Sequence, residues 1–199
     1  MSTALVMRDS VFRRGLHSFC QKWIDRSSLV VEIGSYAGEG SQIMAQYCDR
    51  LICVDPWHAD YGSLIAKGCE DSILREQILD ARIDMDRVER AFARRVSKFS
   101  NVVKWKGYDS SLCELVADHS LDIVYIDAIH DYENVITQIS RWWPKLKVGG
   151  CLAGHDYDAL VWPGVCRAVH ERFSAPDDVH EDTSWAVRKT AEDRISLAA

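Results

Sequence analysis

The chain has 199 residues, of which 47% are hydrophobic and 27% charged, and its formal net charge is −6. This length suffices for one domain with a full hydrophobic core, so we expect a single domain over residues 1–199. No apolar run reaches the roughly 18 residues of a membrane span, and the acidic balance disfavours a general nucleic-acid binder. The first residues lack the pattern of a signal peptide, so a cytoplasmic protein without membrane or nucleic-acid partners is expected.

The seven cysteines include no C-x-x-C pair, and most of them have apolar neighbours. An odd number of cysteines in apolar surroundings is typical of buried free thiols in a reducing compartment. We therefore expect neither a disulfide framework nor a zinc site.

The first predicted element is a helix. Apolar residues recur at helical spacing from Asp9, a suitable N-cap, to Ile24, and residues 1–27 are expected to form a helical extension. The next elements are a strand buried on both faces at residues 29–33, a glycine-rich turn at 34–40, a short helix at 41–48 and a second buried strand at 51–55.

Residues 58–99 form a stretch that is longer than an ordinary crossover and has a mainly helical pattern, so we predict a helical insertion. Its last part carries five basic residues: Arg87, Arg90, Arg94, Arg95 and Lys98. A solvated helix face is the main interpretation, and contact with an anionic substrate is the alternative.

Strands and helices continue to alternate after the insertion. Strands are predicted at residues 101–108, 121–127, 148–154, 178–180 and 185–188, and helices at 110–117, 132–143 and 165–173. This alternation is typical of a doubly wound α/β fold, here a mostly parallel sheet of seven strands with helices on both faces. Ligands bind such sheets beyond the carboxyl ends of the strands, where Glu32, Asp55, Asp109 and Asp127 are expected.

An acid is combined with the glycines of the first turn in the motif Glu32-x-Gly34-x-x-x-Gly38-x-Gly40, and Asp55 ends the next strand. A glycine-rich turn alone is compatible with NAD, FAD, nucleotides and S-adenosylmethionine (SAM). The sequence contains no P-loop, no Tyr-x-x-x-Lys pair and no Gly-x-Ser-x-Gly elbow. These absences disfavour a P-loop nucleotidase, a short-chain dehydrogenase and an α/β-hydrolase.

With this motif, residues 28–190 resemble the class I SAM-dependent methyltransferases, which have a Rossmann-like fold. The resemblance implies that Asp55 binds both ribose hydroxyls of the cofactor, and a carboxylate can indeed accept two hydrogen bonds from a diol. Trp57 is expected to cover the adenine. The other expected cofactor-binding residues are Glu32, Gly34, Ser35, Tyr36, Gly38, Pro56, Tyr108, Asp109, Ser110 and Asp127.

The segment YIDAIHDYENVITQISRWWPKLKVGGCLAGHDYD resembles small-molecule O-methyltransferases of the macrocin O-methyltransferase and cephalosporin-hydroxylase group, and more distantly catechol O-methyltransferase. The resemblance implies methylation of a small-molecule hydroxyl, with His130 as the base. Asp127 and His155 complete the expected catalytic residues, and His155 is the competing candidate for the base. Several of those enzymes hold magnesium at the positions that are Asp127, His155 and Asp156 here. An imidazole suits manganese better than magnesium, so either cation and a cluster without metal stay as alternatives.

The aromatic residues after the fourth strand have two expected places. Trp142 and Trp143 recur at helical spacing and are predicted to lie in the core. Tyr157 and Trp162, in the loop after Gly-His-Asp, are candidates for an acceptor pocket.

Two other functions stay open at this point: a noncatalytic SAM-binding or regulatory protein, and an NAD-binding oxidoreductase. The sequence has no Asn/Asp-Pro-Pro-Tyr-like tetrad for extruding a base, so methylation of nucleic acid or protein ranks low. A homodimer, with the N-terminal helix as one contact, is a further expectation.

Overall fold

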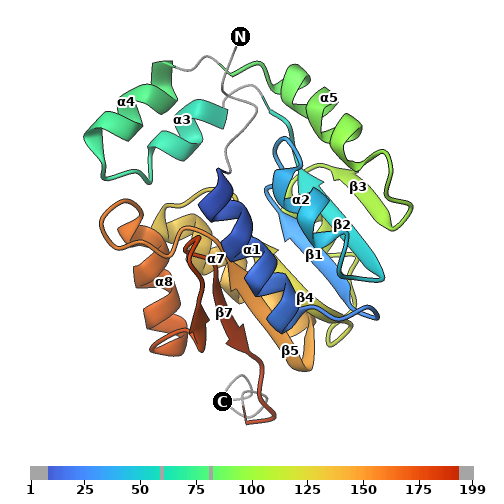
Figure 1. Ribbon diagram of the computed structural model, residues 1–199. Coiled ribbons are helices and arrows are strands. Elements are labelled where there is room, and N and C mark those ends of the chain that lie inside the picture. The colour runs from blue at the N-terminus through green and yellow to red at the C-terminus, as the bar shows by residue number, and fades with distance from the viewer. Residues whose placement is uncertain (1–8, 59–60, 81–82, 193–199) are drawn as a thin grey trace.

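The computed structural model describes residues 9–58, 61–80 and 83–192 (Figure 1). The helices are α1 (Ser10–Trp23), α2 (Glu39–Met44), α3 (Tyr61–Ala66), α4 (Ser72–Asp80), α5 (Met85–Val96), α6 (Asp109–Cys113), α7 (Tyr132–Trp142) and α8 (Pro163–Phe173), with a 3-10 turn η2 (Trp143–Lys145) after α7. The strands are β1 (Leu29–Ile33), β2 (Arg50–Asp55), β3 (Val102–Lys106), β4 (Leu121–Ile126), β5 (Leu146–Gly154), β6 (Asp178–Val179) and β7 (Trp185–Arg188). Three expected segments include residues outside the described ones. These are residues 1–8 of the N-terminal extension, residues 59–60 and 81–82 of the insertion, and residues 193–199 at the end of the expected domain.

The seven strands form one sheet in the order β3-β2-β1-β4-β5-β7-β6. All neighbouring pairs are parallel except β5–β7 and β7–β6. This arrangement confirms the predicted doubly wound, mostly parallel sheet. The strand order reverses between β1 and β4, so the chain leaves these two strands in opposite directions and opens a crevice at their carboxyl ends.

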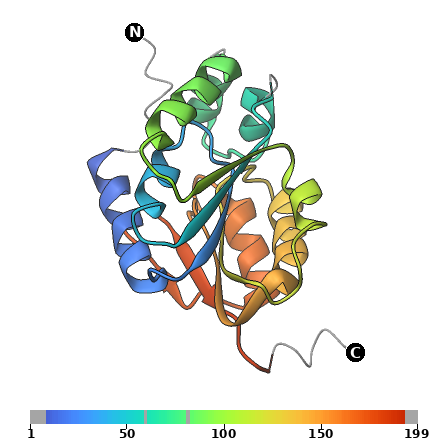
Figure 2. The same cartoon turned by 90° about the vertical axis from the view of Figure 1, so that its right-hand side faces the viewer.

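Helices cover both faces of the sheet (Figure 2). One core contains Val30 and Tyr125 with side chains of α1, α2 and α5, and the other contains Val31 and Val124 with side chains of α6, α7 and α8. Consecutive residues of one strand enter opposite cores because side chains alternate along a strand. Trp142 and Trp143 are 0% and 1% exposed in the second core, which confirms their prediction as core residues.

Local signals set the helix boundaries. Asp9 caps α1 by accepting hydrogen bonds from the backbone N–H groups of Val11 and Phe12 (2.8 and 3.0 Å). Asp131 caps α7 in the same way, through the N–H of Asn134 at 2.9 Å. Pro144 lies in η2 and ends α7, because proline lacks the N–H that another helical turn requires.

Strand β5 is longer than its prediction and begins at Leu146. Its pairing with β4 is irregular between Leu121 and Ile123, and Gly149 has a φ of +85°. Gly149 N–H donates to the Lys189 carbonyl (2.7 Å), and Lys189 N–H donates to the Gly150 carbonyl (2.8 Å). The glycines therefore form a bulge inside the strand.

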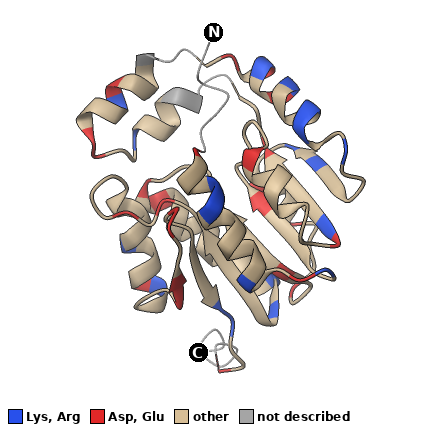
Figure 3. Cartoon of the chain, in the orientation of Figure 1, with Lys and Arg blue, Asp and Glu red and all other residues tan. Residues whose placement is uncertain are grey.

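The three helices α3, α4 and α5 confirm the helical pattern of the described part of residues 58–99. Helices α3 and α4 lie beyond the carboxyl ends of the strands, beside the start of α1, in the upper left of Figure 1. Helix α5 packs on α2 and carries several Arg residues, blue in Figure 3. Arg87, Arg90 and Arg94 are exposed, as the interpretation of a solvated helix face requires.

All seven cysteines are free thiols, and six of them are buried. Within the part of the chain that the structure describes, none of the helices has the length and apolar character of a membrane span.

Candidate active site

The glycine turn between β1 and α2 is shaped by close approaches of the chain to itself. Gly34 has a φ of +91°, and a Cβ atom there would lie 2.0 Å from the carbonyl oxygen of Asp127. Gly38 has a φ of +82°, and its Cβ would lie 2.9 Å from Cδ2 of Phe92 on α5. Glycine is therefore required at both positions, since a side chain would separate β1 from β4 and α2 from α5.

Glu32, in β1, contacts the helix that follows the glycine turn. Its side chain is 2% exposed and accepts a hydrogen bond from the Ser41 hydroxyl on α2. The acid thus links the end of β1 to the helix after the turn, and it also lines the cavity described below.

Asp55, at the end of β2, is 3% exposed and organises the turn from the other side. Its carboxylate accepts hydrogen bonds from the backbone N–H groups of Tyr36 (2.9 Å) and Trp57 (2.7 Å). Burial raises the pKa of Asp55 to about 6, although these two hydrogen bonds act in the opposite direction. Burial and the neighbouring Asp55 together raise the pKa of Tyr36 to about 12.

Trp57 packs inward, with a φ of +45° and a side chain that is 4% exposed. Its Nε1–H donates to the Tyr36 carbonyl at 2.8 Å, and its ring centroid lies 5.0 Å from that of Phe92. The indole therefore ties β2 to the glycine turn and to α5. Its contact with adenine stays a prediction.

The expected adenine-binding residues after β3 have mainly structural contacts here. Tyr108 is the N-cap of α6 and is 58% exposed. Asp109 accepts hydrogen bonds from Arg141 Nη1 (2.8 Å) and Trp142 Nε1 (2.9 Å), which bind its carboxylate to α7. We therefore assign Asp109 an anchoring role between α6 and α7, which the sequence pattern did not indicate.

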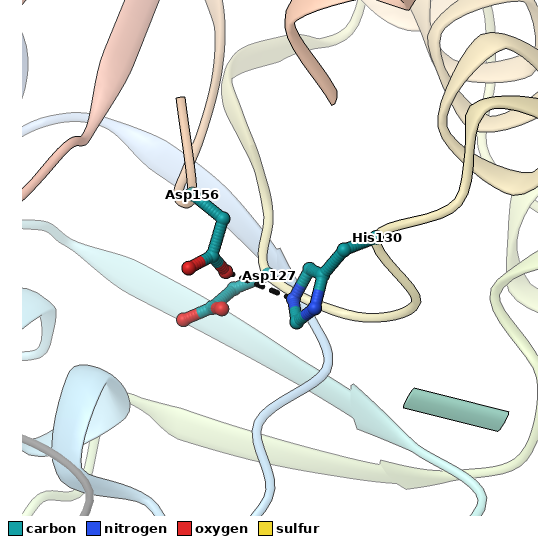
Figure 4. A group of neighbouring side chains, drawn as sticks. All are labelled: Asp127, His130 and Asp156. Carbon is teal, nitrogen blue, oxygen red and sulfur yellow. Dashed lines mark ion pairs between the residues drawn. The ribbon is translucent and has the colours of Figure 1, made fainter. Parts of the chain in front are cut away.

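Three side chains that are far apart in the sequence meet beyond β4 and β5 (Figure 4). Asp127 follows β4, His130 lies in the loop before α7, and Asp156 is two residues beyond β5 with a φ of +62°. One possible ligand atom of each residue lies within 4.8 Å of those of the other two. His130 Nε2 and Asp156 Oδ2 form an ion pair at 2.9 Å.

His155 lies beside this group without belonging to it, and the expected metal-ligand set of Asp127, His155 and Asp156 stays a prediction. Its Nδ1 is 3.1 Å from Asp156 Oδ1, and its Nε2 is 3.9 Å from Oδ2 of the buried Asp182. Its ring centroid is 5.6 Å from that of Phe12 on α1. His155 therefore holds the far side of the Asp156 carboxylate, while His130 joins the two acids.

The charges of this group shift the pKa values in opposite directions. Burial alone would raise the pKa of Asp156, but the imidazoles of His130 and His155 bring it well below its usual value. Burial alone would lower the pKa of His130, but Asp156 outweighs burial, helped by Asp127 and Asp131, and raises it above 6.5. A histidine whose pKa is raised by a neighbouring carboxylate resembles the histidine–carboxylate pairs in which the acid orients a catalytic base.

A cavity of about 340 Å³ joins the glycine turn to the Asp127/His130/Asp156 group. It is lined by Phe12, Glu32, Gly34, Ser35, Tyr36, Ala37, Glu39, Gly40, Ile65, Leu74, Ile78, Ile83, Asp127, His130, His155, Asp156 and Trp162. Eight predicted residues are among them: Glu32, Gly34, Ser35, Tyr36, Asp127, His130, His155 and Asp156. The lining of this cavity, as the described residues define it, does not include Gly38, Asp55, Pro56, Trp57, Tyr108, Asp109 or Ser110.

The lining also differs from the aromatic candidates of the sequence. Trp162 lines the cavity, whereas Tyr157 does not, and the Tyr157 hydroxyl contacts His170 Nε2 on α8. The apolar lining residues Phe12, Ile65, Leu74, Ile78 and Ile83 were not predicted individually, although the last four lie in the helical insertion that was expected to shape the acceptor pocket. Phe12 has the same helical spacing as the core residues of α1, so the sequence carries no signal that separates the two roles.

Comparison with known proteins assigns this architecture to a family. Residues 31–157 match the profile of a family described as "Methyltransferase domain". No curated protein matches the chain.

Solved structures with the same fold include methyltransferases for different acceptors. The O-methyltransferase NovP is 18% identical, with a TM-score of 0.59 over 90% of this chain and 78% of NovP. The N-methyltransferase NodS from Bradyrhizobium japonicum WM9 is 16% identical, with a TM-score of 0.57 over 92% of this chain and 98% of NodS. An rRNA methylase from Streptococcus thermophilus is 16% identical, with a TM-score of 0.54 over 93% of this chain and 99% of the methylase. At these identities the likeness concerns the fold, which is that of class I SAM-dependent methyltransferases.

Proposed function

The chain belongs to this methyltransferase-domain family, and we propose that it transfers a methyl group from SAM to a hydroxyl of a small molecule. The observation that carries the proposal is the single cavity that contacts both the glycine turn and His130. A donor at the turn and an acceptor beside His130 would lie next to each other, and such placement accounts for much of the rate of a bimolecular transfer.

The residues at the turn fit SAM. Four carboxylates line the cavity, those of Glu32, Glu39, Asp127 and Asp156, and they favour a ligand with positive charge such as a sulfonium. Asp55 lies next to the turn without lining the cavity. Each of its oxygens accepts one backbone hydrogen bond, and the remaining lone pairs are the proposed acceptors for the ribose hydroxyls. When bound, SAM supplies a methyl group on a positively charged sulfur that leaves as a neutral thioether.

His130 is the base of the proposed transfer. Nε2 lies 2.9 Å from Asp156 Oδ2, and both ring nitrogens are buried without a hydrogen bond among the described residues. We assign the proton to Nε2, next to the carboxylate, so that Nδ1 carries the free lone pair. Nδ1 takes the hydroxyl proton while the acceptor oxygen forms its bond to the methyl carbon. Asp156 stabilises the imidazolium that results, and His155 keeps the Asp156 carboxylate in place.

A divalent cation, manganese or magnesium, is the second candidate for the same group. Asp127, His130 and Asp156 offer two carboxylates and one imidazole, a set that suits manganese better than magnesium. A cation held there would lower the pKa of the acceptor hydroxyl. It would also occupy His130, so a base at His130 and a cation ligated by His130 exclude one another.

Calorimetry tests the proposal. SAM, S-adenosylhomocysteine (SAH) and NADH are titrated into EDTA-treated protein, and the titrations are repeated with magnesium and with manganese. Binding of SAM and SAH without NADH is the expected result. Binding of NADH alone would instead indicate an oxidoreductase, and SAM that stays intact with every acceptor of a broad panel would indicate a noncatalytic SAM-binding protein. Turnover that survives EDTA supports His130 as base, whereas turnover that requires manganese supports the cation.

A further inference from the structure

The cavity has two chemically different sides. Its floor consists of the glycine turn and the group Asp127, His130 and Asp156, all at the carboxyl ends of β1, β4 and β5. Its roof consists of apolar side chains from α1, α3, α4 and the loops before α5 and α8: Phe12, Ile65, Leu74, Ile78, Ile83 and Trp162. We call these six hydrophobic residues the roof and the polar and charged part of the lining the floor.

The ionisable residues of the lining are four carboxylates, two histidines and Tyr36, and neither lysine nor arginine occurs among the lining residues that the structure describes. The basic residues of α5 lie elsewhere. Arg87, Arg90 and Arg94 are exposed. Arg95 does not line the cavity either; it donates from Nη1 to the Ala37 carbonyl at 2.6 Å and lies 3.9 Å from Glu39. An anionic group in the cavity would thus be desolvated beside carboxylates, with no lysine or arginine among the described lining residues to pair with.

The indole ring of Trp162 lies beside His130, where the reacting hydroxyl is proposed to bind. The ring centroid of Trp162 lies 4.3 Å from that of His130. An acceptor that brings its hydroxyl to His130 would contact this indole, and the rest of the acceptor would extend toward Leu74 and Ile78 on α4. Apolar surface is the part of a molecule that gains most from such surroundings.

We propose that the acceptor is a neutral hydroxyl compound with an apolar body, selected by the roof, and that acceptors with an anionic group on that body are excluded. This inference rests on the proposed methyl transfer and deepens it by naming the substrate class. It also replaces the alternative interpretation of the arginine-rich segment, which predicted contact with an anionic substrate.

Two fluorescent probes with the same arylamine body test the inference on the SAH-loaded protein. N-phenyl-1-naphthylamine is neutral, and 8-anilino-1-naphthalenesulfonate adds a sulfonate. We expect the neutral probe to bind about tenfold or more tightly than the sulfonate, and to be displaced by 2-naphthol but not by 3-hydroxy-2-naphthoate.

Substitutions on α4 connect this preference to the roof. Leu74→Lys places a cation in the roof and should reverse the preference, whereas Leu74→Glu should weaken both probes. The matched control is Ile73→Lys on the same helix, because Ile73 is 70% exposed and does not line the cavity. The control should bind both probes as the wild type does.

Equal binding of the two probes to the wild type overturns the inference, and this measurement does not depend on a variant that folds. The same conclusion follows if Leu74→Lys and Ile73→Lys behave alike. SAH binding, measured by calorimetry on the same samples, separates the two proposals. If SAH binds and the two probes bind equally, only the inference about the acceptor class is overturned. If SAH does not bind, the proposed function and this inference are both overturned.

Discussion

The floor and the roof of the cavity are built from different parts of the fold. The floor lies on strand ends whose positions are fixed by the sheet, with Gly34 and Asp127 leaving neighbouring strands at the same level. The roof is assembled from helices and loops outside the sheet, and its side chains come from five separate segments between residues 12 and 162. The proposed chemistry, which needs exact geometry, is thus assigned to the rigid part, and the proposed selection of the acceptor to the part that can vary.

The first way to test this division is to remove the base from the floor. His130→Ala should reduce turnover by about a thousandfold, a barrier increase of about 4 kcal/mol, because the hydroxyl proton then has no acceptor of suitable pKa. SAH affinity should change by less than about twofold, since His130 belongs to the acceptor side. His17→Ala, which removes a contact to Tyr47 away from the cavity, is the control. Equal losses of turnover and SAH affinity would contradict the assignment of His130 as base.

A second test concerns the rigidity of the floor. Gly34→Ala places a Cβ atom 2.0 Å from the Asp127 carbonyl oxygen, so β1 and β4 must separate at the site. Gly149→Ala has a similar positive φ but meets nothing within 4 Å, and it controls for backbone strain. We expect Gly34→Ala to lose about 3 kcal/mol more of the free energy of unfolding than Gly149→Ala, measured in urea. Similar losses would mean that the close approach at Gly34 is easily relieved.

The buried acid of the floor gives a prediction about pH. Folding raises the pKa of Asp55 from 3.8 to about 6, so the folded protein holds this proton more tightly than the unfolded chain. The stability that Asp55 contributes is therefore complete below pH 3.8 and is lost as the pH rises through about 6. In urea unfolding at pH 4 and pH 7, Asp55→Asn should gain about 2 to 3 kcal/mol relative to the wild type over this range. A constant difference between the two proteins would show that Asp55 is not desolvated.

The smallest expected effect lies outside the cavity, where α5 supports the floor. Arg95 donates to the Ala37 carbonyl at 2.6 Å and lies 3.9 Å from Glu39, so it stabilises the turn at which we propose that the methyl donor binds. Arg95→Met should weaken SAH binding about fivefold, or about 1 kcal/mol, by calorimetry. Arg94→Met removes an exposed neighbour and should have no effect. Weaker SAH binding in both variants would indicate that the overall charge of α5 matters instead of the contact between Arg95 and Ala37.

Much of the floor could be predicted because the pattern of a parallel sheet carries the positions of its strand ends. Continuous apolar runs located β1, β2 and β4, and the residues directly after them had to meet at one edge. His130 was indicated by the resemblance of its segment to small-molecule O-methyltransferases, and its place beside Asp156 agrees with the adjacency of β4 and β5. The roles of Asp109 and His155 were not visible, since hydrogen bonds to Arg141 and a second contact to Asp156 depend on how α6, α7 and the loops pack.

By itself, the sequence determined the doubly wound sheet, the glycine turn and the acids at its edge, because strand periodicity and the requirement for glycine act locally along the chain. The tertiary structure alone decided which side chains face the cavity. Phe12 and Ile78 follow the same helical pattern as core residues, and Leu74 differs from Ile73 only in the direction it takes from α4. Side-chain direction on a helix becomes burial or lining only when the neighbouring elements are in place, so the apolar roof that we assign to acceptor selection exists only in the folded chain.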